Sequence, residues 1–331
     1  MQETRVAVAG TSFPSIRGHL EEMLPGAVVE MLPVDRLRSD GCAAEVLIPA
    51  MTRIDATVMD RVSGLRLIHQ WGAGLDGVDI DAASARGILV ANVPAAVGGN
   101  ADSVAEWCVM AAIAVNRRLP MLQQVVRSGS GWGEPQGRAL HGRTAGIVGL
   151  GGIGQALAVR LRPFGMRVLG VRRRPDPELA GRLGLDWLGT AGQLDELLRR
   201  SDCLFLCLPL TDTTRGLIDD RALSLLPDGA SVVNAGRGGV LDHGALLRAL
   251  ESGRLGGAAL DVFADEPLDP SSPLASRPDV LATPHIAGVT DASYRGIART
   301  VIENLRRLHD GMPLRNCVNA DRAGAQASRD S

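Results

Sequence analysis

This sequence of 331 residues has little net charge, few cysteines and few long apolar runs. The formal net charge is only −2 at pH 7, so the chain offers no broad basic face and a nucleic-acid partner has little electrostatic support. No stretch approaches the ~18 apolar residues that a membrane-spanning helix needs. The N-terminus has no charged leader, apolar core or cleavage site of a signal peptide. We therefore expect neither a nucleic-acid nor a membrane partner.

Cysteine occurs in an odd number and without a C-x-x-C pair, at Cys42, Cys108, Cys203, Cys207 and Cys317. A reduced, cytoplasmic location fits this usage best. Cys203 and Cys207 are four residues apart, so a strand would turn both to one face. Because no His or acidic ligand lies near them in the sequence, we interpret both as small core residues, and we predict no metal site.

Apolar residues and glycine are abundant, at 45% of the chain and 40 residues respectively. Short apolar runs separated by helix-length stretches predict strands of a parallel sheet. The first series of such runs lies at 5–9, 28–32, 46–50, 66–69 and 88–91. The second series lies at 145–149, 167–171, 203–208, 230–234, 257–260 and 279–282. A long helix over 98–128, broken or kinked near Pro120, separates the two series.

These patterns predict an α/β protein with two doubly wound parallel-sheet domains. A dinucleotide-binding domain, residues 99–287, is expected to be inserted into a domain built from residues 1–98 and 288–331. A further helix is expected at about 290–310. The last residues, 320–331, are small and polar, and we expect them to form a frayed tail.

A glycine-rich turn follows the strand predicted at 145–149. Gly149, Gly151 and Gly154 form G-x-G-x-x-G between that strand and a helical stretch, with a second strand following within ~30 residues. Glycine lets the backbone approach a pyrophosphate, whose charge is met by amide groups at the start of the helix. The alternative, a glycine turn without a ligand, is disfavoured by this context, so we predict a dinucleotide site here.

The acidic residue that NAD sites usually place ~20 residues beyond these glycines is missing. Arg172, Arg173 and Arg174 follow the second strand instead, and Pro175 is expected to end its pairing. A guanidinium can bind the additional phosphate of NADP through two charge-assisted hydrogen bonds. We therefore interpret Arg172 and Arg173 as a phosphate clamp and Arg174 as solvated. Two alternatives stay open: Asp176 binding the ribose, or a solvated basic turn.

Unusual polar residues follow three of the later strands. Arg237 lies in N-A-G-R-G, Asp261 and Glu266 lie in L-D-V-F-A-D-E-P, and His285 lies in T-P-H-I-A-G. The carboxyl ends of parallel strands border the ligand crevice in such folds. Arg237 can hold a substrate carboxylate and polarise a carbonyl, and His285 can exchange the hydroxyl proton. Glu266 would orient the imidazole and favour its protonated form, although each residue alone also has an ordinary structural explanation.

Together these segments resemble the D-isomer-specific 2-hydroxyacid dehydrogenase family. The likeness covers nearly the whole chain, most strongly from about 66 to 318, and its motifs keep the family's order and spacing. It is carried by G-A-G-L-D-G-V-D at 72–79, N-A-D-S-V-A-E at 100–106, L-H-G-R-T-A-G-I-V-G-L-G-G-I-G at 140–154, C-L-P-L-T-D-T-T-R-G-L-I at 207–218 and the three segments above.

The resemblance implies a Rossmann cofactor domain inserted into a flavodoxin-like substrate domain, with Arg237, Glu266 and His285 catalytic and Arg237 and His285 also binding substrate. It implies that the backbone amides of Ala73 and Gly74 bind the substrate carboxylate, with Trp71 and Leu75 suggesting an apolar wall. Members commonly dimerise through their nucleotide domains. The positions implied to line the cofactor are Val104, Gly149, Gly151, Gly152, Ile153, Gly154, Leu208, Pro209, Thr214, Ala235, Asp261 and Gly288.

With Arg172 at the position where an acidic residue is usual, the chain resembles the branch of glyoxylate and hydroxypyruvate reductases that uses NADP. We thus predict an NADP-preferring reductase of small 2-oxo acids, with NAD use still possible. Dinucleotide-sensing corepressors of the same fold are an alternative, as is a phosphite or phosphonate dehydrogenase. A formate dehydrogenase is disfavoured because that branch pairs Gln with His, whereas this chain offers Glu266, despite the matching Asn100.

Overall fold

A computed structural model describes residues 4–174 and 176–327, with side-chain surroundings assigned as far as Ala323. The chain divides into two compact units. Unit 1 contains residues 1–100 and 290–331, and unit 2 contains residues 101–289. The chain passes from one unit to the other after residues 100 and 289, which in both cases is two residues later than the boundary expected from the sequence. Because nothing fixes the arrangement of the two units, each is described by itself.

Unit 1 is built on a five-stranded parallel sheet with the order β2-β1-β4-β6-β7. The strands are β1 (Arg5–Ala9), β2 (Val28–Leu32), β4 (Val46–Ile48), β6 (Leu67–His69) and β7 (Leu89–Ala91), and a small separate sheet pairs β3 (Cys42–Ala43) with β5 (Val62–Ser63). Counted along the chain, the main sheet has the flavodoxin-like order 2-1-3-4-5. The predicted flavodoxin-like fold is thereby confirmed.

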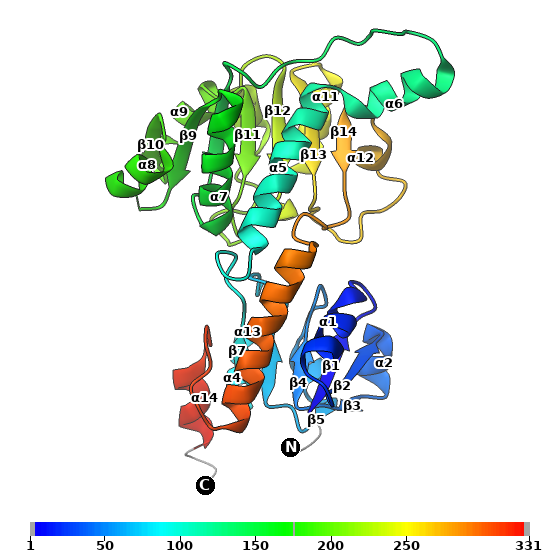
Figure 1. Ribbon diagram of the computed structural model, residues 1–331, viewed down its shortest axis with the longest axis vertical. Coiled ribbons are helices and arrows are strands. Elements are labelled where there is room, and N and C mark those ends of the chain that lie inside the picture. Colours follow the sequence, from blue (N-terminus) through cyan, green and yellow to red (C-terminus); the bar gives the residue numbers. More distant parts are fainter. Residues whose placement is uncertain (1–3, 175, 328–331) are drawn as a thin grey trace. The chain divides into compact units, whose positions relative to one another are not determined.

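Helices cover both faces of this sheet, because successive strand residues point to opposite sides. In β1, Val6 and Val8 pack in the cluster that contains residues of α1 (Ser15–Met23) and α13 (Asp291–His309). Ala7 and Ala9 pack in the cluster on the other face. That cluster contains residues of α2 (Val34–Ser39), α3 (Ala56–Met59) and α4 (Ile80–Ala85). Figure 1 shows α13 beside α1, which it contacts.

Unit 2 is built on a seven-stranded parallel sheet with the order β10-β9-β8-β11-β12-β13-β14. Its strands are β8 (Thr144–Val148), β9 (Arg167–Arg172), β10 (Trp187–Thr190), β11 (Cys203–Leu206), β12 (Ala230–Asn234), β13 (Leu255–Leu260) and β14 (Val280–Ala282). The first six strands have the order 3-2-1-4-5-6 that characterises the Rossmann fold. This confirms the predicted doubly wound dinucleotide fold, with a seventh strand added.

Two layers of helices enclose the sheet of unit 2 (Figure 1). Cys203 and Phe205 of β11 pack toward α5 (Asn100–Asn116), α7 (Gly152–Leu161) and α8 (Pro177–Leu183). Leu204 and Leu206 pack toward α9 (Leu194–Arg199), α10 (Asp220–Ser224) and α11 (His243–Glu251), with α12 (Pro273–Ser276) beyond. Short 3₁₀ turns lie at Arg162–Phe164, Ala191–Gln193 and Gly238–Val240.

The helix expected over 98–128 is in fact two helices. α5 ends at Asn116, and α6 (Leu119–Ser128) begins after Arg118, whose backbone is left-handed with φ 54°. The break therefore lies before Pro120, which occupies the first turn of α6, where its missing N–H is no loss. The strand β10 was not predicted.

The expectation of a frayed tail was wrong for residues 320–327, which form α14 (Ala320–Ala327) and contact α4 and β7. The reason is Asn319, which is 3% exposed. Its Oδ1 accepts from the amide of Val90 at 2.7 Å, and its Nδ2 donates to Ser84 and to the carbonyl of Ile88, both at 2.9 Å. Residues 328–331, as well as Pro175, lie outside the described part of the chain.

The five cysteines carry free thiols, and the structure contains no disulfide in its described part. Cys203 is buried and Cys207 half-buried, and both pack in the same apolar cluster. No group of three or more potential metal ligands occurs among residues 4–174 and 176–327. Within the same ranges, no helix is both long and apolar enough to cross a membrane.

Candidate active site

The glycine-rich turn of unit 2 has the geometry of a dinucleotide-binding loop. Gly149 has φ 100°, and a Cβ there would lie 2.8 Å from the carbonyl oxygen of Cys207. A Cβ on Gly154 would lie 2.0 Å from the carbonyl oxygen of Gly149, so only glycine lets α7 pack this closely. A Cβ on Gly151, in contrast, would meet no atom within 4 Å. Protein packing therefore leaves the space over Gly151 open.

The helix α7 begins beside this open space, at Gly152. Its first-turn amides, including those of Gly152 and Ile153, have no acceptor within the helix and carry partial positive charge. Such an end binds a phosphate well. The loop and the helix start thus fit the pyrophosphate of a nicotinamide dinucleotide.

Arg172 is the last residue of β9 and is half-buried, whereas Arg173 and Arg174 are exposed. Within the described residues none of the three forms an ion pair, so no carboxylate of the protein neutralises their positive charges. Asp176, the competing ribose ligand, caps α8: its Oδ1 accepts from the amides of Glu178 at 3.1 Å and Leu179 at 3.2 Å. This capping role explains Asp176 without a ligand.

The other predicted cofactor residues of unit 2 gather around the same sheet edge. Leu208 and Pro209 follow β11, Ala235 follows β12, and Gly288 follows β14, while Val104 packs from α5. Thr214 shapes the loop after β11, because its Oγ1 donates to the carbonyl of Pro209 at 2.7 Å and accepts from the amide of Thr211 at 2.8 Å. The residues that follow β11, β12 and β14 lie beyond the carboxyl ends of these parallel strands, where ligands bind in open α/β sheets.

His285 and Glu266 are in direct contact. The Nδ1 of His285 lies 2.8 Å from Oε2 of Glu266, and their side chains are 29% and 18% exposed. The second carboxylate oxygen, Oε1, accepts from the amide of Phe263 at 2.8 Å. Glu266 is therefore fixed by its own loop and engages Nδ1, so proton exchange with a substrate would involve the other ring nitrogen, Nε2.

Asp261 holds the segment that carries His285. Its Oδ1 accepts from the hydroxyl of Thr283 at 2.6 Å and from the amide of Ile286 at 2.8 Å, and its Oδ2 accepts from the amide of Ala287 at 2.8 Å. Asp261 is only 2% exposed, and burial raises the pKa of its carboxyl group against the opposing effect of these hydrogen bonds. His285 itself has φ 56°, a left-handed conformation that this network maintains.

Arg237 follows β12 on a segment held by two glycines. A Cβ on Gly236 would lie 2.6 Å from the carbonyl oxygen of Leu208, and a Cβ on Gly238 would lie 1.9 Å from the carbonyl carbon of Phe263. Asn234 secures the turn, donating to the carbonyl of Arg237 at 3.2 Å and accepting from the amide of Gly236 at 3.1 Å. These supporting roles of Asn234, Gly236 and Gly238 were not predicted from the sequence.

In unit 1, the loop that contains Ala73 and Gly74 was predicted to bind the substrate carboxylate, and the carbonyl groups of both residues accept hydrogen bonds from side chains. Gln70 donates to the carbonyl of Gly74 at 2.8 Å, and Asn92 donates to that of Ala73 at 2.7 Å. The amides of Ala73 and Gly74 make no hydrogen bond within the described residues. Sequence reasoning missed Gln70 and Asn92, since a single polar residue gives no periodic signal.

Comparison with known proteins identifies the family. Residues 109–287 match the family model described as D-isomer specific 2-hydroxyacid dehydrogenase, NAD binding domain. The chain is 34% identical to a glyoxylate reductase of Aeropyrum pernix, with 97% of each chain covered. This chain belongs to the D-isomer specific 2-hydroxyacid dehydrogenase family. The predicted family is thereby confirmed, and with it the enzyme class, an oxidoreductase acting on CH–OH with a nicotinamide cofactor.

Other relatives differ in name and in length. The chain is 36% identical to a D-3-phosphoglycerate dehydrogenase of Archaeoglobus fulgidus over 83% of this chain but only 51% of that protein. It thus spans about half the length of the phosphoglycerate dehydrogenases it matches. A solved structure, the TT0316 protein of Thermus thermophilus, superposes with a TM-score of 0.81 at 35% identity, covering 95% of this chain and all (100%) of that one.

Proposed function

We propose that this dehydrogenase family member is an NADPH-preferring reductase of small 2-oxo acids such as glyoxylate or hydroxypyruvate, yielding the corresponding 2-hydroxy acids, in the D configuration where the product is chiral. The observation that carries the chemistry is the 2.8 Å contact between Glu266 and Nδ1 of His285 at the carboxyl edge of the dinucleotide-binding sheet. The relatives named glyoxylate reductase support the substrate class. The cofactor, when bound, supplies the hydride.

The side chains divide the remaining work. Nε2 of His285 gives its proton to the carbonyl oxygen as that oxygen becomes a hydroxyl, and Glu266 stabilises the imidazolium beforehand. Arg237 holds the substrate carboxylate and favours negative charge on the reacting oxygen. The amides of Ala73 and Gly74 are the proposed donors to the carboxylate from unit 1. In the oxidative direction the same imidazole removes the proton.

The proposed preference for NADPH rests on Arg172 and Arg173. Both are cations without an ion pair in the described chain, and no acid occupies the end of β9. Charge-assisted hydrogen bonds contribute about 1.5–3 kcal/mol each, so we expect Arg172→Asp to raise the KM for NADPH by about 10–100-fold and to change that for NADH far less. Arg167→Asp, at the opposite end of β9 and exposed, is the matched control.

Steady-state kinetics with NADPH and NADH on glyoxylate, hydroxypyruvate, pyruvate and the oxidation of D-3-phosphoglycerate test the proposal. We expect the highest kcat/KM with NADPH and a two- or three-carbon 2-oxo acid, and loss of kcat in His285→Ala. Higher efficiency with NADH, unchanged by Arg172→Asp, would refute the clamp. Tight dinucleotide binding without turnover would favour the corepressor alternative. Oxidation of phosphite would favour the alternative of a phosphite or phosphonate dehydrogenase.

We also propose that the protein forms a homodimer through α5 and α7. An apolar hollow there is lined by Met110, Leu119, Val159 and Phe164, whose side chains are 42–44% exposed. Contiguous exposed apolar surface of this kind marks an interaction site, and a second copy presents the same surface. Light scattering should give twice the mass of 34.8 kDa, falling to the mass of one chain in Phe164→Glu.

The free cysteines agree with the further proposal of a cytoplasmic location.

A further inference from the structure

A second pocket of about 400 Å³ lies in unit 2, at the amino ends of the strands. It is lined by residues at or before the starts of β12, β13 and β14, including Ser231, Leu255 and Asp279. The candidate active-site residues follow the carboxyl ends of the same strands. Because the five residues of β12 span about 13 Å, the pocket is separate from the dinucleotide site.

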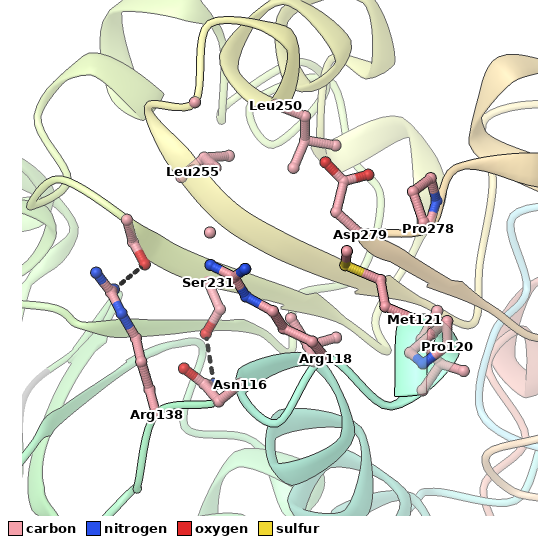
Figure 2. Close-up of a pocket in the computed structure, with 15 residues that line it drawn as sticks. Asn116, Arg118, Pro120, Met121, Arg138, Ser231, Leu250, Leu255, Pro278 and Asp279 are labelled. Atoms are coloured by element: carbon pink, nitrogen blue, oxygen red, sulfur yellow. Dashed lines mark hydrogen bonds between the residues drawn. The ribbon is translucent and has the colours of Figure 1, made fainter. Parts of the chain in front are cut away.

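Two arginines dominate the charge of this pocket. Figure 2 shows Arg118 and Arg138 among the residues that line it. The side chain of Arg118 makes no hydrogen bond or ion pair within the described residues, and the guanidinium of Arg138 uses one N–H, from Nη1, for the carbonyl of Gly229. A guanidinium has five N–H donors, so most of those on both side chains remain available.

The single acidic residue among those lining the pocket is already neutralised. Both carboxylate oxygens of Asp279 accept from Arg277, at 2.8 Å each. This bidentate pair leaves the lining with a net positive charge. The pocket therefore favours an anion, and both a carboxylate and a phosphate match the planar guanidinium.

The floor of the pocket has an acceptor of its own. Asn116 is only 7% exposed, and its Nδ2 donates to the carbonyl of Ala112 at 2.8 Å. Figure 2 shows its second hydrogen bond, in which Nδ2 donates to Oγ of Ser231 at 3.0 Å. Its Oδ1 accepts no hydrogen bond from the described residues. This oxygen is not among the fully buried polar atoms that lack a partner, so it is accessible and can accept a hydrogen bond from a ligand that carries a hydroxyl or amino donor.

Backbone strain is present at the same place. Arg118 is a non-glycine residue at φ 54°, a left-handed conformation that is strained for such residues and tends to occur at functional sites. This conformation ends α5 and starts α6, and it places Arg118 in the lining of the pocket. Val115, Met121 and Leu255 supply apolar wall, which suits an organic body rather than a bare ion.

We propose that this pocket binds a small organic acid, with a carboxylate or phosphate held by Arg118 and Arg138 and a hydroxyl or amino group donating to Asn116. This site is independent of the reaction proposed above. The pocket binds the organic acid whether or not the dinucleotide is present, since it lies at the opposite end of the sheet from the dinucleotide site.

Isothermal titration calorimetry of the full-length protein tests the site with four probes: 3-hydroxybenzoate, benzoate, glycerol 3-phosphate and inorganic phosphate. The first and third carry a hydroxyl donor, while the second and fourth separate the carboxylate source from the phosphate source. We expect saturable binding of one hydroxylated probe, at least tenfold tighter than its partner without the organic hydroxyl. Equal affinity within both pairs would overturn the role of Asn116.

Variants separate this site from the active site, which can also bind acids. Arg118→Asn keeps a residue that tolerates left-handed backbone, and Arg138→Gln tests the second cation. Each should weaken binding at least tenfold, whereas Arg127→Gln, an exposed arginine further along α6, should leave the dissociation constant unchanged. Unchanged affinity in both pocket variants, or no saturable binding of any probe to the wild type, would refute the proposal.

Discussion

The buried imidazole of His69 should make unit 1 sensitive to acid. His69 is 0% exposed at the end of β6, with Nδ1 3.1 Å from the carbonyl oxygen of Gln70 and Nε2 2.9 Å from Nδ2 of Asn304. The orientation of the Asn304 carboxamide is fixed by Arg315, which accepts at its carbonyl and donates from its amide. Nε2 must therefore be an acceptor, and the proton resides on Nδ1.

Protonating this ring would bury a charge and set an N–H against the N–H of Asn304. Burial lowers the pKa of His69 from 6.5 to about 4, against the smaller opposing effect of its hydrogen bond to Gln70. Because the pKa in the folded chain is the lower one, the unfolded chain takes up the proton first. Stability is full above pH ~6.5 and falls below it, by about 2 kcal/mol at pH 5 and about 3 kcal/mol at pH 4.

The measurement is urea unfolding of the wild type and of His69→Gln at pH 7, 6, 5 and 4.5, followed by circular dichroism. Glutamine offers one acceptor and one donor group but does not titrate, so the substitution has a constant cost at every pH. The free energy of unfolding of the wild type should fall by about 2 kcal/mol more than that of the variant between pH 7 and pH 5. Parallel pH curves for the two proteins would refute the reasoning.

Three further substitutions probe the supporting contacts. Asp261→Asn leaves one oxygen for three donors, so unit 2 should lose about 2–4 kcal/mol of unfolding free energy in denaturant titrations. Gly238→Ala should lower kcat at least tenfold with an unchanged circular dichroism spectrum, because its Cβ would meet the backbone of Phe263, whereas Gly181→Ala, in open space, should not. Asn319→Ala should cost about 2–4 kcal/mol and speed hydrogen exchange at the amide of Val90.

The architecture was predictable because the strands are regular and buried on both faces. Ten of the eleven runs identified in the sequence begin within one residue of an observed strand, and the run at 257–260 lies inside β13. The two-residue strands β3 and β5 were also missed, and β10, which has the sequence W-L-G-T at an edge of the seven-stranded sheet, is too short and too mixed to give a signal. The helix α14 was missed because its stability comes from Asn319 and not from its own composition.

The candidate site was predictable only as a set of residues. Glu266 and His285 are 19 positions apart, and nothing in their local sequence states that they touch. Motif order and the rule that carboxyl ends of parallel strands share one edge brought them together. The supporting residues escaped notice for the opposite reason, since Gln70 and Asn92 act on single carbonyl groups that become neighbours only in the fold.

Both carboxylates behind His285 are held by backbone amides. Glu266 accepts from the amide of Phe263, three residues before it, and Asp261 accepts from two amides that follow His285. Their positions therefore depend mainly on the backbone of two adjoining loops, together with the hydroxyl of Thr283 in the case of Asp261. Since electrostatic stabilisation depends on groups that need not reorganise during reaction, such anchoring suits a proton donor that must act at a fixed point. A substitution that loosens either loop should thus lower kcat more than it raises KM.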